Sequence, residues 1–182
     1  MKIKEAMKLA RERGMLYLGQ NGLDKYIGDG AALYAACGNY DTETLFILTD
    51  TTEKQKEKLR VTYMDNELSF MADIDGTEEE ITRMGFSINY GGDTFSIFET
   101  EQGAVFVNKK YFKPLADDLD MEFKLRRIGD TKMVIVHYGF VTAAAICPFE
   151  LLNLGFADRI ARLDALCAAA QRNRLFCEEA GE

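Results

Sequence analysis

The sequence predicts an α+β fold: a duplicated β-α-β-β-β unit with an N-terminal helix and a C-terminal helical extension. Two stretches repeat the order of strand, helix and several strands, the chain begins with helical periodicity, and its composition changes after Pro148. The duplicated domain is expected over residues 1–151, with half-repeats at about 15–98 and 99–151. Residues 152–182 are expected to form the C-terminal amphipathic helix.

Apolar residues at the start of the chain recur with the spacing of a helix. Ile3, Met7 and Ala10 share one face, and charged residues lie between them. Gly14 is suited to end this helix because glycine readily adopts the left-handed conformation found after a last turn. An amphipathic helix is therefore predicted over residues 2–13.

The first half-repeat reads as short strands around one helical region. Asn21-Gly22 and Gly91-Gly92 are typical of tight hairpin turns, and Asp41 or Thr42 can cap a helix. Strands are expected at 15–18, 26–27, 31–36, 61–64, 68–74, 86–90 and 94–98, and helices at 42–48 and 52–59.

The second half-repeat follows the same order. A strand at 104–107 precedes a helix at 108–119 and strands at 121–128, 133–138 and 141–147. In the alignment of the two halves, residues 30–34 correspond to 103–107, and residues 60–64 correspond to 121–125. Beyond the second half, apolar residues recur at three- and four-residue steps on a long helix: Phe156, Ile160, Leu163, Cys167 and Ala170.

The formal net charge is −8, and its position matters more than its size. Residues 61–107 contain ten acidic and one basic side chain, whereas the rest of the chain is nearly balanced. The total argues against a surface covered by nucleic acid, but lysines gather on the predicted helices. Those lysines either lie on ordinary solvated faces or form an inner basic strip beneath acidic outer loops.

Most classes of catalytic and metal site are not supported. The four cysteines are far apart and His137 is the only histidine, so the paired ligands of a zinc site are missing. Phosphate-binding and serine-nucleophile motifs are also absent. No metal, no cofactor and no enzymatic activity is expected. The one alternative is a nucleophile and base formed by Cys147 and His137 on successive strands.

The chain contains no apolar run long enough to span a bilayer, and residues 1–14 lack the features of a signal peptide. We therefore expect a cytoplasmic protein without membrane contact. Scattered cysteines in such a chain are expected to be small buried hydrophobic residues.

Two motifs connected by strand residues carry a resemblance to a known family. Residues 107–119 read VNKKYFKPLADDL and residues 146–151 read ICPFEL. Over residues 107–151 the chain resembles the last domain of bacterial DNA sliding clamps, the processivity factors of replication. The family's chains carry two or three such domains, whereas this chain has the length of one.

The resemblance implies a ring-forming, non-enzymatic fold whose basic helices hold duplex DNA through its phosphates. The matching DNA-facing candidates are Lys54, Lys56, Lys58, Lys109, Lys110 and Lys113. It also implies a pocket for short peptides of replication proteins, and the matching positions are Ile146, Pro148, Phe149 and Leu151.

Two functions follow from the sequence. The leading expectation is a non-catalytic, DNA- or replication-associated accessory protein with a clamp-like domain, of a phage or mobile element. Its partners would be double-stranded DNA, replication proteins or their peptides, and further copies of the chain. The alternative is an acidic protein-interaction module that binds a protein partner or self-associates and does not bind DNA.

Overall fold

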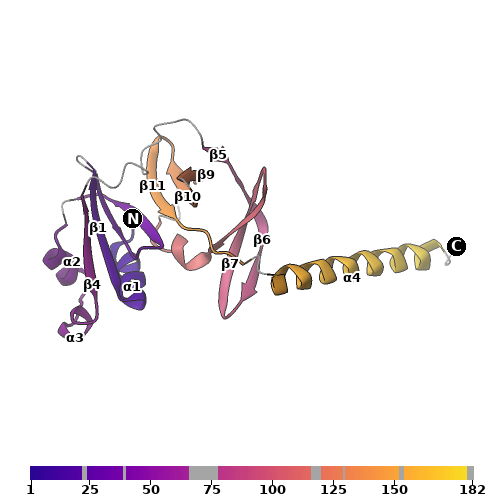
Figure 1. Ribbon diagram of the computed structural model, residues 1–182, viewed down its shortest axis with the longest axis horizontal. Coiled ribbons are helices and arrows are strands. Elements are labelled where there is room, and N and C mark those ends of the chain that lie inside the picture. The colour runs from indigo at the N-terminus through magenta and orange to yellow at the C-terminus, as the bar shows by residue number, and fades with distance from the viewer. Residues whose placement is uncertain are drawn as a thin grey trace. The chain divides into compact units, whose positions relative to one another are not determined.

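The computed structural model describes residues 1–21, 24–38, 40–65, 78–115, 120–128, 130–151 and 154–179. The chain forms two compact units, Met1–Phe149 and Glu150–Glu182 (Figure 1). The first unit combines helices with two β-sheets, and the second contains one long helix. The predicted α+β class and the helices near both ends of the chain are thus confirmed.

The larger sheet has eight strands in the order β4-β1-β2-β3-β11-β10-β9-β5. All neighbouring pairs are antiparallel except β1 and β4, which run parallel. In chain order its strands are β1 (Met15–Asn21), β2 (Asp24–Gly28), β3 (Ala32–Ala36), β4 (Arg60–Asp65), β5 (Glu79–Glu80), β9 (Glu122–Ile128), β10 (Thr131–Tyr138) and β11 (Val141–Ile146).

The smaller sheet has three antiparallel strands, β6 (Thr82–Tyr90), β7 (Asp93–Thr100) and β8 (Gly103–Asn108). The predicted turn at Gly91-Gly92 is confirmed, since both residues have positive φ and lie between β6 and β7. The predicted turn at Asn21-Gly22 and the predicted strand at 68–74 lie, at least in part, outside the described residues.

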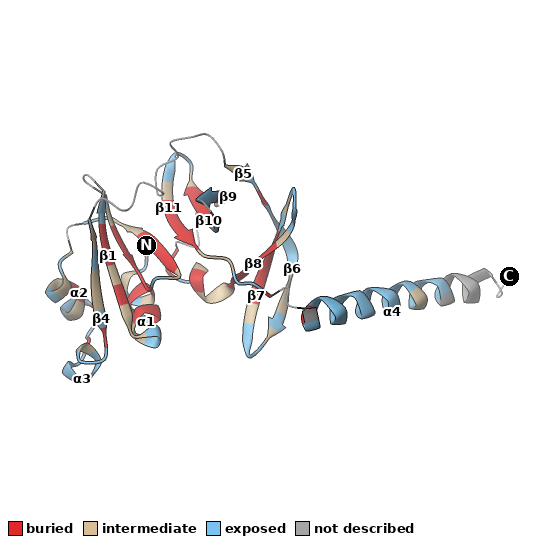
Figure 2. Cartoon of the chain, in the orientation of Figure 1, coloured by how far each residue is buried: buried red, intermediate tan, exposed pale blue. Residues whose placement is uncertain are grey.

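Helix α1 (Ile3–Arg13) supplies one side of the main core. Ala6, Met7, Leu9 and Ala10 are buried, because the helical period places them on one stripe. They belong to the same apolar cluster as inward-facing strand residues such as Leu16, and α1 contacts β1 and β2. Figure 2 shows this pattern as buried segments on α1 and on the strands. Buried residues of the smaller sheet, such as Phe98 and Val107, belong to the same cluster, so the main core lies among α1 and both sheets.

Two further helices connect β3 to β4. In α2 (Thr42–Leu48), the N-cap Asp41 accepts a hydrogen bond from the Thr44 backbone N–H, as predicted. Only α3 (Glu53–Lys56) forms within the predicted helix at 52–59. The rest of that segment turns back, and Arg60 N–H then donates to the Gly14 carbonyl, which starts the parallel pairing of β4 with β1.

Over residues 108–115 the predicted helix at 108–119 is wrong in form, and residues 116–119 lie outside the described residues. A four-residue 3-10 helix, η2 (Lys109–Phe112), follows β8, and its Asn108 N-cap accepts from the Lys110 N–H. The next bonds run from Lys113 N–H to Lys110 O and from Leu115 N–H to Phe112 O, both with three-residue spacing. Pro114 has no N–H to donate, so a helical bond is missing at that position.

Two strands that the sequence alignment matches, β3 and β8, each pair with the last strand of the other predicted half. β3 pairs with β11, and β8 pairs with β7 in a hairpin. The expected correspondence of residues 60–64 with 121–125 does not extend to pairing. β4 pairs with β1 at one edge of the sheet, whereas β9 lies between β10 and β5.

The second unit contains α4 (Leu154–Glu179), a helix of 26 residues. Its many alanines favour helix intrinsically because they lose no side-chain entropy. Within the described residues, every helix is too short or too polar to cross a bilayer.

Candidate functional site

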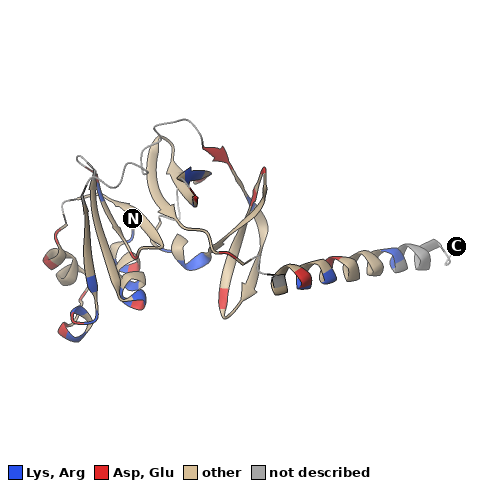
Figure 3. Cartoon of the chain, viewed as in Figure 1, with Lys and Arg blue, Asp and Glu red and all other residues tan. Residues whose placement is uncertain are grey.

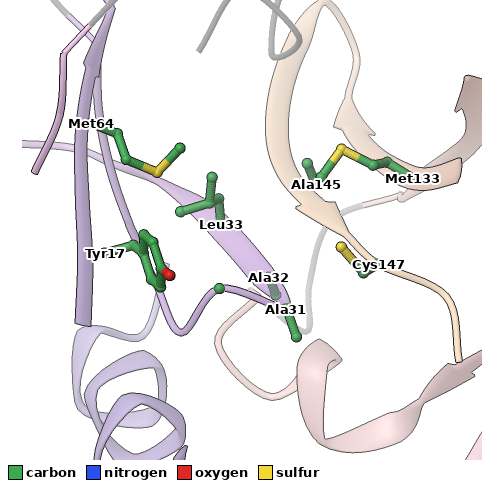
Figure 4. A pocket seen from close by; sticks show the side chains of 9 residues that line it. Tyr17, Ala31, Ala32, Leu33, Met64, Met133, Ala145 and Cys147 are labelled. Carbon is green, nitrogen blue, oxygen red and sulfur yellow. The ribbon is translucent and has the colours of Figure 1, made fainter. Parts of the chain in front are cut away.

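An apolar pocket opens on the second face of the eight-stranded sheet. Tyr26, Leu33, Ile135 and Ala145 form a cluster of buried side chains separate from the main core. All four residues lie on strands. Side chains alternate between the two faces of a sheet, so these residues form a cluster on one face and the main core packs on the other. The pocket beside this cluster has a volume of about 220 Å³ (Figure 4) and is lined by Tyr17, Gly30, Ala31, Ala32, Leu33, Met64, Met133, Ala145 and Cys147.

The walls of the pocket come from distant parts of the sequence. Tyr17 on β1 and Met64 on β4 lie on one side, and Met133 on β10 and Cys147 after β11 lie on the other (Figure 4). Methionine side chains are flexible and polarisable, so they adapt to apolar groups of different shapes. The pocket is suited to a small apolar group and offers few charges to fix it.

The loop before β3 is held by a buried carboxylate. Asp29 is 2% exposed, and its Oδ1 accepts hydrogen bonds of 2.9 Å from the backbone N–H groups of Ala31 and Ala32. Gly30 within this loop has a φ of 84°, and a Cβ there would lie 2.7 Å from the Tyr17 ring. The loop therefore places backbone directly against Tyr17, which only glycine permits.

Cys147 faces the pocket, whereas its neighbour Ile146 faces the main core. The Cys147 N–H donates to the Ala31 carbonyl at 2.8 Å and extends the pairing of β11 with β3. Burial is the main cause that raises the pKa of the Cys147 thiol, so the neutral form is favoured. A raised pKa does not suit a thiolate nucleophile.

His137 does not pair with Cys147. The β10–β11 register places Ile146 opposite Val134, so Cys147 lies beside Met133, four residues from His137 along the strand. That separation corresponds to about 13 Å at the rise of a β-strand. His137 Nε2 instead lies 3.6 Å from Glu78 Oε2. The geometry does not support the nucleophile–base alternative.

A buried ionic cluster surrounds Glu78, and the sequence analysis did not identify it. The Glu78 side chain is 3% exposed and bonds the guanidinium of Arg126, which is 6% exposed. Lys124 Nζ lies 3.3 Å from Glu78 Oε2, and His137 contacts the same oxygen. Arg126 and Lys124 alternate with apolar Leu125 on β9. In the sequence, this alternation looks like a strand with one face in water. It does not show that Lys124 and Arg126 face a buried carboxylate.

The three lysines predicted near the first helix are not all free to bind phosphate. Lys56 Nζ lies 2.6 Å from Glu53 Oε1 and 5.5 Å from the centre of the Phe46 ring. Lys54 and Lys58 are exposed. Acidic residues of α1 and α3 lie among the basic ones in Figure 3, so this surface is mixed in charge.

The lysines predicted on the second helix lie on or beside η2. Lys113 is exposed, whereas Lys109 and Lys110 are half-buried. Lys110 lines a second hollow of about 270 Å³ with Arg13, Glu12 and Asp29 among its walls. Segments α3 and η2 lie on different sides of α1 (Figure 1). The six lysines therefore form two groups separated by α1.

The four predicted pocket residues differ in their surroundings. Ile146 is fully buried in the main core, and Pro148 is half-buried. Phe149 is 52% exposed, yet its ring lies 5.1 Å from that of Phe95 and its N–H donates to Phe106 O. Leu151 is buried and belongs to the second unit. Of the segment 146–151, it is the intervening Cys147 that lines the apolar pocket.

Helix α4 exposes much of its apolar stripe. Ile160 is 40%, Leu163 57% and Leu166 60% exposed. Cys167 is exposed as well, as is Cys37, so the expected burial of the cysteines is wrong at these two positions. Only Phe156 of the predicted stripe is buried. Three large apolar side chains on successive turns of one helix form an apolar patch, and such patches mark interaction sites.

No family model, curated protein or solved structure matches this chain. Among the described residues, no group of three or more histidine, cysteine, aspartate or glutamate side chains is placed to hold a metal ion. Functional assignment therefore rests on the geometry of the pocket, the charged groups and α4.

Proposed function

We propose that the protein is a non-catalytic interaction module that associates with protein through helix α4. The observation that carries this proposal is the exposure of Ile160, Leu163 and Leu166 on that helix. Apolar side chains of this size stabilise an association by about 1.5–3 kcal/mol each when fully buried. An isolated helix gains little from propensity alone, so a partner would also stabilise α4 itself.

The charge of the chain fits a protein partner better than DNA. The net charge is −8, and the basic groups of α3 and η2 are separated and mixed with carboxylates. Phosphate binding depends on several cations reaching one backbone together, because each contact releases counterions. The distribution of lysines therefore supports the protein-interaction alternative.

A DNA- or replication-associated clamp-like protein is the second candidate. It is favoured by one observation: the aligned strands β3 and β8 each pair with the last strand of the other predicted half. This pairing fits a duplicated unit, but a fold alone does not assign a function. The basic groups of η2 and α3 would be the DNA contacts.

Site-specific photo-crosslinking in cells tests the proposed function. A photoreactive phenylalanine analogue is placed at Leu163, in the exposed stripe, or at Ala165, on the other side of the same helix. We expect a discrete protein adduct from position 163 and none from position 165. No adduct at position 163, or equal adducts at both positions, would contradict the proposal.

Titration with duplex DNA tests the second candidate. Affinity is measured between about 50 and 200 mM salt for the native chain and for variants of Lys54 and Lys58 or of Lys109 and Lys113. A clamp-like DNA contact predicts a steep loss of affinity with salt, and a shallower slope in both variants. Binding that is absent at 50 mM salt, or insensitive to salt, would exclude this function.

A further inference from the structure

We infer that α4 pairs with α4 of a second copy of this chain as a parallel, two-stranded coiled coil. The inference rests on the proposed function and names its partner. The apolar residues Ile160, Leu163, Cys167 and Ala170 are separated by steps of three, four and three residues. These steps place them at alternating a and d positions of a heptad, the pattern that drives two helices to supercoil.

These four residues form the proposed seam between the two helices, and its first two side chains are accessible to a partner. Ile160 occupies an a position and Leu163 the following d position, and both are exposed. Leu166, which is 60% exposed, occupies the adjacent g position and widens the seam. Phe156 is one heptad before Leu163 but is already buried within the chain. The inferred seam therefore begins at Ile160.

The charge of α4 favours a second copy as the partner. Residues 154–179 contain four acidic and four basic side chains, although the whole chain has a net charge of −8. Two copies of α4 therefore meet without net repulsion, and most of the acidic excess, −6 of the net −8, lies in the other unit.

Arg159 and Asp164 determine the orientation. They occupy a g position and the e position five residues later. In a parallel pair, g of one helix lies beside this e of the other, so two Arg159–Asp164 pairs form across the seam. In an antiparallel pair, g lies beside g and e beside e. Those pairings offer Arg159 no acid and Asp164 no base, so only the parallel arrangement is complementary.

The first experiment measures the mass of the full chain in solution over a range of concentrations. We expect a species near 41 kDa, twice the 20.5 kDa of one chain, in equilibrium with the monomer. Leu163→Glu places two carboxylates in the seam and removes two apolar side chains, so the dissociation constant should rise by a factor on the order of 100 or more. The matched control Ala165→Glu, at the outward f position, should leave it within about twofold.

A charge exchange tests the orientation independently of core packing. Arg159→Asp or Asp164→Arg alone places like charges across the seam and should weaken the dimer several-fold at low salt. The double variant restores two opposite-charge pairs in a parallel dimer and should recover the native dissociation constant. Failure of the double variant to recover would overturn the parallel arrangement.

The outcomes also separate this inference from the proposed function. A monomer at every concentration, or equal effects of Leu163→Glu and Ala165→Glu on mass, overturns the pairing of two copies. If a photo-adduct still forms at position 163 but has a mass other than two chains, the interaction module remains and its partner is another protein. If neither dimer nor adduct forms, both proposals fail.

Discussion

At the scale of single residues, the buried carboxylate of Glu78 has the largest electrostatic consequence. It faces Arg126, Lys124 and His137 while being 3% exposed. Removing the Glu78 carboxylate would break several buried charge interactions at once in a region of low dielectric constant. Removing the Glu78 charge should therefore lower the free energy of unfolding more than breaking any exposed ion pair of the described structure.

We predict that Glu78→Gln lowers the free energy of unfolding by about 3–5 kcal/mol, because the buried Arg126 would lose its ion pair with Glu78. Urea denaturation measures the change. Asp50→Asn is the matched control: Asp50 contacts Lys4 at 3.3 Å, and the two side chains are 84% and 71% exposed, so the loss should stay below about 1 kcal/mol. Equal losses in the two variants would show that the buried cluster around Glu78 stabilises the fold no more than an exposed ion pair does.

Gly30 lies beside the apolar pocket, with its backbone against the Tyr17 ring. Gly30→Ala should destabilise the protein by about 1–3 kcal/mol, since its φ of 84° is unfavourable for alanine and the new Cβ would meet the Tyr17 ring. Gly85→Ala is the control, because a Cβ there has no atom within 4 Å. Thermal unfolding of both variants checks the prediction, which is refuted if Gly30→Ala is as stable as the native chain.

At the scale of secondary-structure elements, one buried hydrogen bond connects β3 with η2. The Tyr34 hydroxyl donates to the Tyr111 carbonyl at 2.9 Å. Burial, with the charge of Asp29 as a second cause, raises the pKa of Tyr111 to about 12 and that of Tyr34 well above its ordinary value. Both phenols are therefore kept protonated in the folded chain, which favours the donation from Tyr34.

These shifts predict that the protein loses stability in alkali. Below pH 10 both phenols are protonated whether the chain is folded or unfolded, so pH has no effect through them. Between about pH 10 and 12 the unfolded chain releases these protons first, and the free energy of unfolding should fall. Urea midpoints measured from pH 8 to 11.5 test this.

Tyr34→Phe should reduce that alkaline slope and cost about 1–2 kcal/mol at pH 8, because the Tyr111 carbonyl loses its donor. Tyr63→Phe is a suitable comparison, since Tyr63 is 65% exposed. An alkaline slope that is the same in the native chain and in Tyr34→Phe would contradict the assignment of this slope to Tyr34.

At the scale of the whole molecule, the division into two units separates stability from association. The main core lies in Met1–Phe149, whereas the exposed stripe lies in α4. A substitution at an exposed position away from core contacts usually changes stability by less than about 0.5 kcal/mol. Association and folding should therefore respond to different substitutions.

Leu163→Glu should accordingly leave the urea unfolding of the first unit within about 0.5 kcal/mol while abolishing the dimer. The helical circular dichroism signal of the native chain should melt at a temperature that rises with protein concentration, because association stabilises α4 by mass action. That dependence should vanish in Leu163→Glu and persist in Ala165→Glu. A melting temperature independent of concentration in the native chain would contradict the coupling.

The sequence by itself determined the α+β class and most elements, because local signals suffice for them. Helical periodicity and Gly14 predicted α1, the Gly91-Gly92 turn predicted the β6–β7 hairpin, and three- and four-residue steps predicted α4. Pro114 opposed the predicted helix at 108–119, where a 3-10 helix forms. Capping and periodicity act over a few residues, so they can be read without the fold.

Only the tertiary structure decided the pairing of β4 with β1, the pocket between Tyr17 and Met133, and the enclosure of Glu78 by β9 and β10. Each joins residues from distant parts of the chain. Strand order and burial depend on which segments pack together, and this choice is made by the whole core. The same charged residue can lie in water or face a buried carboxylate, and the difference comes from its tertiary neighbours.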